Sequence, residues 1–208
     1  MNERPALGLI VVAGFIGTIF DIPPIFALTA ESFLTLERAN VSIDDDDELT
    51  TRLIVEGLLI PTDGTGGAFG YGILTEDGDD AILVAHTHPE VMDSEDQRFI
   101  EDPIWHNHFV KLGDNVEQCG EDQGVVDITW QSPGEVRIDD NTASISGVPT
   151  DEFEGWDSIT GKELSMTLGE TVSEVISFKL DPVFDEEDGL QAVCVTDIRS
   201  AEEEVNLD

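Results

Sequence analysis

The sequence has few basic side chains, with nine Lys and Arg against 46 Asp and Glu, and its formal net charge at pH 7 is −37. Binding to nucleic acid needs clustered Lys and Arg that neutralise phosphates, so this composition argues against a nucleic-acid partner. An anionic membrane surface is disfavoured for the same reason, whereas metal cations are attracted. Because 40% of the 208 residues are apolar, the acidic side chains are expected to coat a folded core. Such a coat predicts a halophilic source, since concentrated salt screens the repulsion between like charges.

Cysteine is also scarce. Cys119 and Cys194 are the only two, and the CxxC spacing of zinc ribbons is absent, which argues against a thiolate metal site. In an exported protein, an even number of cysteines predicts a disulfide. Closing this long loop would stabilise the fold by up to about 4.5 kcal/mol, through the lower entropy of the unfolded chain. Two buried free thiols are the alternative.

One long hydrophobic run occurs, over residues 6–20, and it is shorter than the roughly 20 residues that a membrane-spanning helix needs. Its length, the Pro-Pro pair that follows and the small residues Ala27 and Ala30 are typical of a cleaved secretory signal peptide. A retained membrane anchor and a buried core element are the alternatives. We therefore expect a signal peptide or anchor in residues 1–30 and a single acidic domain in residues 31–208. The domain would be secreted or lie at the cell surface, and it would touch the membrane only through an uncleaved N-terminal segment.

Helical periodicity is scarce, and short apolar or alternating segments separated by turn signals dominate the rest of the chain. For example, AFGYGIL (68–74) and AILVAHTH (81–88) flank a turn rich in Asp and Gly and predict a hairpin. About nine or ten strands at this spacing predict an all-β fold, an antiparallel β-sandwich for which an immunoglobulin-like arrangement is one option. One helix is expected over residues 93–102, with Asp93 as its N-cap and Pro103 as its stop.

All four histidines fall in two His-x-His pairs, His86 with His88 and His106 with His108. In a strand, residues i and i+2 point to the same face, so the members of each pair are expected to project together. If the two strands are neighbours, four imidazoles meet at one patch. Imidazole suits Cu(II), Zn(II) and Ni(II), and Cu(II) has the highest affinity of the three. The doubled spacing therefore predicts a transition-metal site, for copper before zinc.

The number of imidazoles that bind decides between functions. Four form a closed site that suits storage, transport or electron transfer, whereas three leave a position at which a bound water becomes a nucleophile. Two alternatives need no metal: histidines packed in an aromatic cluster with Trp105 and Phe109, and a histidine active site or pH switch. The candidate carboxylates that would orient the imidazoles are Glu90, Asp93, Glu101 and Asp102.

Other familiar motifs are absent. The acidic runs 43–48, 76–80 and 185–189 lack the full EF-hand spacing with its closing Glu, so we interpret them as solvated turns. The nucleophile elbow G-x-S-x-G is missing, and the GTGG stretch (64–67) lacks the Lys-Ser/Thr ending of a phosphate-binding loop. The sequence therefore leaves open whether the protein is an enzyme.

Three segments carry a resemblance: EDPIWHNHFVKLG (101–113), CGEDQGVVDITWQSPGEV (119–136) and SFKLDPVFDEEDGLQAVCVTDI (177–198). Together they resemble a group of small exported archaeal proteins of unknown function, and DPIWHNHFV is the most specific part. The resemblance implies an exported archaeal protein but no activity. The cysteine-containing segments of that group match both cysteines here, which supports a bridge between them.

Three hypotheses follow. The first is an exported β-sandwich that binds a copper or zinc ion through its four histidines, and buffers, carries or senses metal outside the membrane. The second is a cell-surface structural module that assembles with cell-envelope proteins and whose histidines are merely packed. The third is a metal-dependent enzyme that uses three of the four histidines. Geometry separates them, because only the first and third require the imidazoles to face a common point.

Overall fold

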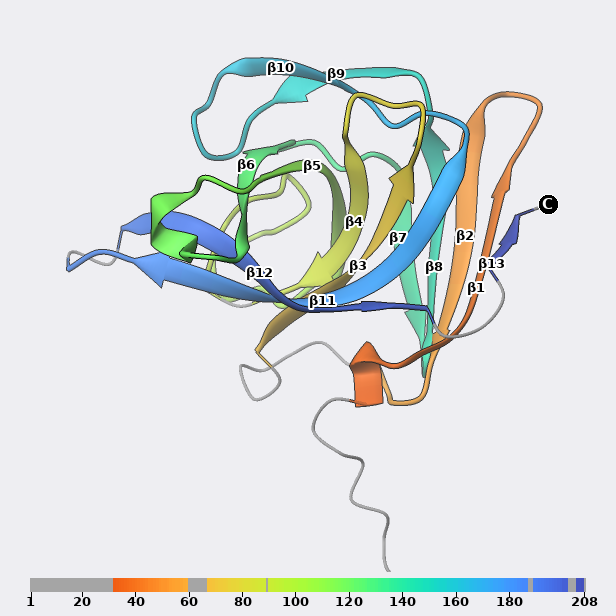
Figure 1. The fold of residues 1–208 in the computed structure, drawn as a ribbon, viewed down its shortest axis with the longest axis horizontal. Coiled ribbons are helices and arrows are strands. Elements are labelled where there is room, and N and C mark those ends of the chain that lie inside the picture. Colours follow the sequence, from red (N-terminus) through yellow and green to blue (C-terminus); the bar gives the residue numbers. More distant parts are fainter. Residues whose placement is uncertain (1–31, 60–66, 89, 187–188, 202–204, 208) are drawn as a thin grey trace, which may run out of the picture.

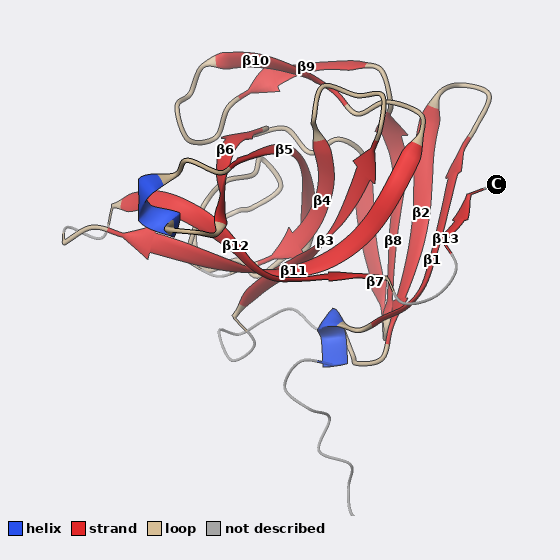
Figure 2. Cartoon of the chain, in the orientation of Figure 1, coloured by secondary structure: helices blue, strands red, loops and turns tan. Residues whose placement is uncertain are grey.

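Strands form where apolar and polar residues alternate, and they build almost all of the structure, as Figures 1 and 2 show. The computed structural model describes residues 32–59, 67–88, 90–186, 189–201 and 205–207. The signal peptide or anchor expected in residues 1–30 lies outside the described residues. The elements in chain order are η1 (Ser32–Leu34), β1 (Leu36–Ile43), β2 (Glu48–Val55), β3 (Ala68–Thr75), β4 (Ile82–Thr87), β5 (His106–Gly113), η2 (Glu117–Cys119), β6 (Gln123–Ile128), β7 (Glu135–Asp139), β8 (Thr142–Pro149), β9 (Glu152–Trp156), β10 (Glu163–Thr167), β11 (Val172–Phe184), β12 (Leu190–Ser200) and β13 (Val205–Leu207).

Six of these strands close into a barrel in the order β11, β12, β6, β5, β4 and β3 (Figure 1). The long β11 completes the ring, because residues 172–180 pair with β3 and residues 176–184 pair with β12. The predicted all-β class and the predicted β3–β4 hairpin are confirmed. The closed barrel differs from the predicted sandwich. Turn spacing and strand length are alike in both architectures, whereas closure depends on which distant edges pair.

A second sheet, in the order β13, β1, β2, β8 and β7, packs against one side of the barrel. Its β13 runs parallel to β1, while its other pairs are antiparallel. Leu53 and Ile145 from this sheet meet Tyr71, Leu83 and Phe109 from the barrel, and all five side chains are fully buried. We call this apolar layer between the sheet and the barrel the inter-sheet core.

The inside of the barrel holds a separate apolar cluster. Val84, Val110, Ile128, Ile176 and Phe178 all belong to it and are buried. Because side chains alternate along a strand, β4 sends Leu83 to the inter-sheet core and Val84 to the barrel interior. Each barrel strand on the sheet side therefore has two buried faces with different neighbours.

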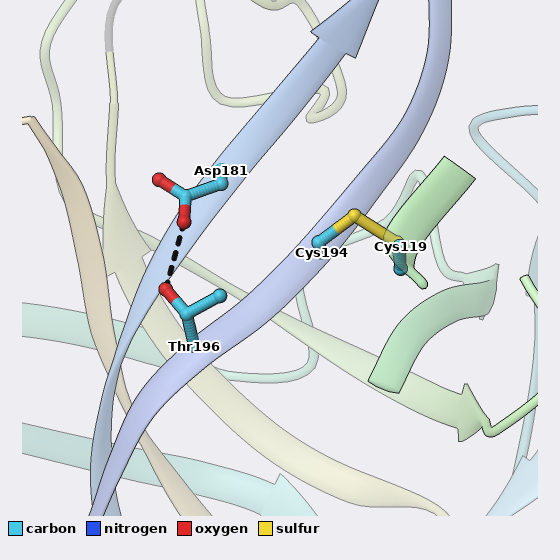
Figure 3. The surroundings of a disulfide bond; sticks show 4 residues. All are labelled: Cys119, Asp181, Cys194 and Thr196. Carbon is cyan, nitrogen blue, oxygen red and sulfur yellow. Dashed lines mark hydrogen bonds between the residues drawn. A yellow bond between two sulfur atoms is a disulfide. The ribbon is translucent and has the colours of Figure 1, made fainter. Parts of the chain in front are cut away.

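A disulfide between Cys119 and Cys194 joins η2 to β12 (Figure 3), which confirms the predicted bridge. The two cysteines are separated by 75 positions in the sequence. Close to the bridge, the Thr196 hydroxyl donates a hydrogen bond of 2.8 Å to the Asp181 carboxylate, across the β11–β12 pair (Figure 3). The bridge anchors β12, one wall of the barrel, to the segment that connects β5 with β6.

The predicted helix over residues 93–102 is wrong, because this segment forms a loop of turns and bends between β4 and β5. Its polar side chains bind the loop backbone: Gln97 accepts hydrogen bonds from the amides of Asp93 and Ser94, at 3.0 and 3.2 Å. Such local side-chain bonds compete with helical ones. Among the described residues, no helix is long and apolar enough to cross a membrane.

Candidate metal centre

The two histidine pairs lie on adjacent strands of the barrel. β4 and β5 pair antiparallel, with His86 opposite His106 and Val84 opposite His108. The side chains of His86, His106 and His108 share the inward face with Val84 and Val110, and they are at most 3% exposed. Side-chain alternation therefore brings the imidazoles together as predicted. The centroids of neighbouring rings are 4.5 to 5.1 Å apart.

A single carboxylate lies at the centre of the four rings. Asp93 Oδ2 is 3.1 Å from His88 Nε2 and 3.9 Å from His86 Nε2. Asp93 Oδ1 is 3.1 Å from His106 Nε2 and 3.7 Å from His108 Nε2. All four Nε2 atoms thus face the same group, and the Asp93 side chain is only 13% exposed.

These groups are close enough to share one ion. One ligand atom each from His86, Asp93, His106 and His108 can be chosen so that all four lie within 4.8 Å of one another. In a tetrahedral site with bonds of about 2.0–2.1 Å, neighbouring ligand atoms are about 3.3–3.4 Å apart. The widest pair of the set would therefore have to close by up to about 1.5 Å to bind one ion.

Backbone carbonyls orient two of the rings. His106 Nδ1 is 3.0 Å from the Ile104 carbonyl oxygen, and His108 Nδ1 is 2.5 Å from that of Thr129. A carbonyl oxygen only accepts hydrogen bonds, so each Nδ1 carries the proton and donates it. In a neutral ring, Nε2 then presents its lone pair toward Asp93. Metal-binding histidines commonly donate their second nitrogen to a carbonyl in this way.

Several imidazole nitrogens remain buried without a hydrogen-bond partner among the described residues. They are both nitrogens of His86, Nδ1 of His88 and Nε2 of His108. Buried polar atoms are nearly always paired, so a cluster of unpaired ones requires an explanation. In His106, the Nε2 lone pair faces a carboxylate oxygen, which is also an acceptor. Either a proton or a cation between them would relieve this contact.

Burial decides between the proton and the cation. It lowers the pKa of His86 well below the usual value, and the charges of His106 and His88 lower it further. Burial also lowers the pKa of His106, although the hydrogen bond that the protonated ring would donate from Nε2 to Asp93 acts in the opposite direction. The neutral forms of His86 and His106 are therefore favoured near pH 7, and neutral imidazole is the form that binds metal.

Asp93 is ionised in this setting. Burial raises the pKa of its carboxyl group, but the charge of His108 and the hydrogen bonds with His106 and His88 outweigh that effect and hold the pKa well below its usual range. One carboxylate surrounded by imidazole nitrogens is a ligand set for a divalent transition metal.

The loop that carries Asp93 is held by one distant residue and by one residue of the loop itself. Ser158, 65 positions further along, donates a hydrogen bond of 2.6 Å from its hydroxyl to the Asp93 carbonyl oxygen. Gln97 also donates to the Val91 carbonyl oxygen, at 2.9 Å. The Asp93 backbone is thus fixed on both sides, which keeps the carboxylate directed into the end of the barrel.

A glycine makes room for His86. Gly70 on β3 lies opposite His86, and a Cβ atom at Gly70 would be 2.7 Å from both the His86 Cβ and the Ala85 carbonyl oxygen. Any side chain there would force β3 away from β4. In the β3 sequence, the neighbouring aromatic residues Phe69 and Tyr71 point to the inter-sheet core, so the glycine falls on the inward face.

The other candidate carboxylates lie elsewhere. Glu90 and Glu101 are exposed, and Asp102 accepts a hydrogen bond from the Arg98 amide within its own loop. Asp93 was predicted to orient ligands and to cap a helix, whereas it reaches the imidazoles directly from a loop. Its position five residues after His88 was the only sequence signal for this role.

The acidic runs behave as turns. Asp44 accepts hydrogen bonds from the amides of Asp46 and Glu48, and Asp185 accepts one from Gly189. Within the described part of the chain, the histidine and Asp93 group is the one cluster of three or more His, Cys, Asp or Glu side chains with metal-ligand spacing.

Comparisons with protein-family models, with curated proteins and with solved structures found no match. The function is therefore argued from the geometry of this site.

Proposed function

We propose that this protein binds a transition-metal ion, copper or zinc, through His86, His88, His106 and His108, with Asp93 as a fifth group. One observation carries the proposal: four buried Nε2 atoms from two paired strands face a single ionised carboxylate. Histidines that were merely packed would not need to meet at one point, and an uncompensated buried carboxylate is costly. A divalent cation between these groups satisfies all of them.

The donor set supports copper or zinc. Imidazole nitrogen suits both ions, and Cu(II) has the higher affinity. Both cysteines are joined in a disulfide away from the histidines, so no thiolate competes for the ion. The strongly negative chain, with its net charge of −37, raises the local concentration of cations of either kind.

We further propose that the protein carries or buffers this metal outside the cell membrane, in an archaeal, salt-rich setting. Three features support this location: the hydrophobic run in residues 6–20, the acidic composition, and the disulfide, a bond that persists in oxidising compartments. A protein with four imidazoles and a carboxylate around its ion is suited to holding it firmly.

The test is elemental analysis of protein that has been purified without a metal-affinity step. We expect about one equivalent of copper or zinc in the wild type and a loss of most of it in His106→Ala, because one ligand and the orientation of Asp93 are removed. Asn107→Ala is the matched control, since Asn107 is the next residue, is equally buried, and donates its side-chain hydrogen bond to the Pro133 carbonyl oxygen. It should retain the metal.

Equal metal content in wild type and His106→Ala would refute the site. The site would also be refuted if Asn107→Ala lost metal as completely as His106→Ala, because the loss would then reflect general damage to β5. Isothermal titration of the metal-free forms with Cu(II) and Zn(II) would rank the two ions.

A further inference from the structure

The barrel encloses a cavity next to the metal centre. Its volume is about 70 Å³, and its walls are the inward faces of all six barrel strands, for example Val84, Val110 and Val195. Among the described residues, the only polar side chains in the walls are His86, His88 and Asp93. The cavity is thus an apolar space with one polar end, and that end is the candidate metal centre.

The unpaired nitrogens of His86 lie at this polar end. The His86 side chain is 4% exposed, and neither of its ring nitrogens has a hydrogen-bond partner among the described residues. His106 and His108 do not contribute to the cavity walls, so the cavity borders the metal centre on the side of His86 and His88. An ion held between the four rings would face the cavity from that side.

The walls select the kind of molecule that fits. A charged or strongly polar molecule would lose its hydration and find no partner beyond the metal centre, which is unfavourable. Cavities lined by apolar residues stay dry and accept small apolar molecules, and one of about 150 Å³ holds benzene or xenon. A cavity of about 70 Å³ is half that size, so its ligand is smaller than benzene.

The cavity also has a way in. Ile159 is part of its wall and yet 52% exposed, and Leu190 is part of its wall and 37% exposed. Ile159 directly follows Ser158, which binds the backbone of Asp93. The exposed part of the cavity wall at Ile159 therefore lies close to the loop that carries Asp93.

We infer that the barrel interior is a binding chamber for a small, uncharged, apolar molecule, which meets the metal ion on the side of His86 and His88. The contact with the ion rests on the proposed function, whereas the chamber does not. The protein would then do two things: it holds the ion, and its cavity lets a small neutral molecule reach that ion.

The chamber is tested with xenon gas and methyl NMR of the full chain as purified. Xenon pressure should shift the methyl signals of Val84, Val110 and Val195, which line the cavity. The methyl signals of Val41 and Val148, buried in the inter-sheet core, are the internal control and should not shift. Absence of shifts at the cavity valines, or equal shifts in both sets, would overturn the chamber.

The second test compares a variant in which the chamber is filled with one in which it stays open. Val195→Phe places a large side chain in the cavity and should abolish the xenon shifts at Val84 and Val110. Val195→Thr, which keeps the shape of valine, should retain them. If Val195→Phe does not fold, Val125→Phe fills the cavity from β6. Xenon shifts that persist in a folded, filled variant would refute the assignment.

Contact with the ion is tested with carbon monoxide, a small neutral probe that binds Cu(I). Copper(I)-loaded protein should show an infrared C–O stretching band, and this band should be lost in Val195→Phe at unchanged copper content. A copper-loaded wild type without a band would overturn the contact. If the chain takes up no copper or zinc at all, the proposed function and the contact both fail, and the xenon result still decides the chamber.

Discussion

The inward and outward faces of β4 and β5 are equally buried but differ in chemistry. Toward the inter-sheet core, Leu83 and Phe109 are fully buried among apolar neighbours. Toward the barrel interior, His106 and His108 are buried to the same degree, yet they face a carboxylate, and His86 beside them has unpaired nitrogens and borders a cavity. Burial alone therefore does not identify a core. The outward face supplies stability, and the inward face holds the polar groups that a function requires.

The largest effect is expected from a substitution on the outward face of β5. Phe109→Ala should lower the free energy of unfolding by about 3–5 kcal/mol, because it leaves a cavity in a closely packed layer. Phe109 packs against Phe153, with ring centroids 5.3 Å apart. Urea unfolding measures the loss. Metal affinity at a temperature where the variant is folded should be unchanged, and a large fall in affinity would show that the two faces are not independent.

The second largest effect is expected from a substitution among the polar groups on the inward side. Asp93→Asn removes the central charge and should lower metal affinity by more than about 100-fold, or about 2.7 kcal/mol, which titration of the metal-free protein measures. The accompanying loss in stability of the metal-free protein should be smaller than that of Phe109→Ala. Asp96→Asn is the control, because Asp96 lies in the same loop but accepts a hydrogen bond from Ser132. Comparable affinities in the two variants would argue against Asp93 as a ligand.

The buried histidines of the inward face should also make stability and metal binding depend on pH. The unfolded chain takes up protons on its histidines below about pH 6.5, but burial lowers the pKa of His86 and His106 in the folded state. The unfolded state then binds more protons, so the stability of the metal-free protein should fall as pH drops below about 6.5. Because these pKa values are lowered, metal should stay bound below about pH 6.5 and be released as the pH falls further, where protons compete for Nε2. Dialysis at stepped pH with elemental analysis measures this, and a metal content that is constant to pH 4 would exclude imidazole ligands.

The smallest expected effect comes from outside the barrel. Ser158→Ala removes the hydrogen bond to the Asp93 carbonyl oxygen and should cost about 1 kcal/mol, seen as a few-fold weaker metal affinity. Ser165→Ala is the control, since Ser165 donates its hydrogen bond to the exposed Glu152. If both variants bind metal like the wild type, the Asp93 loop is held by its other contacts.

Much of the local structure could be predicted from the sequence. Period-two alternation indicated the strands that carry the histidines, and the doubled His-x-His spacing indicated that each pair shares a face. The disulfide followed from two cysteines in a chain with an expected signal peptide, and the structure contains it. These are short-range features, because they depend on residues a few positions apart or on simple counts.

Three features were missed, and each depends on contacts between distant residues. The barrel closes because β3 pairs with β11, about 100 positions further along the chain, which turn spacing does not encode. The segment around Asp93 starts like a capped helix, but it is a loop whose backbone is held by Ser158, 65 positions further along the chain. The cavity exists because six strands surround it, and the residue pattern of any one strand does not predict it.

Local sequence thus accounts for what each strand presents: imidazoles on one face and apolar side chains on the other, since alternation is a property of any extended chain. The tertiary structure accounts for what those faces meet. It sets β4 beside β5, brings Asp93 into the ring of imidazoles and leaves an apolar space next to them. The physical reason is that a ligand set and a cavity are made of distances between residues far apart in the chain, and only folding sets those distances.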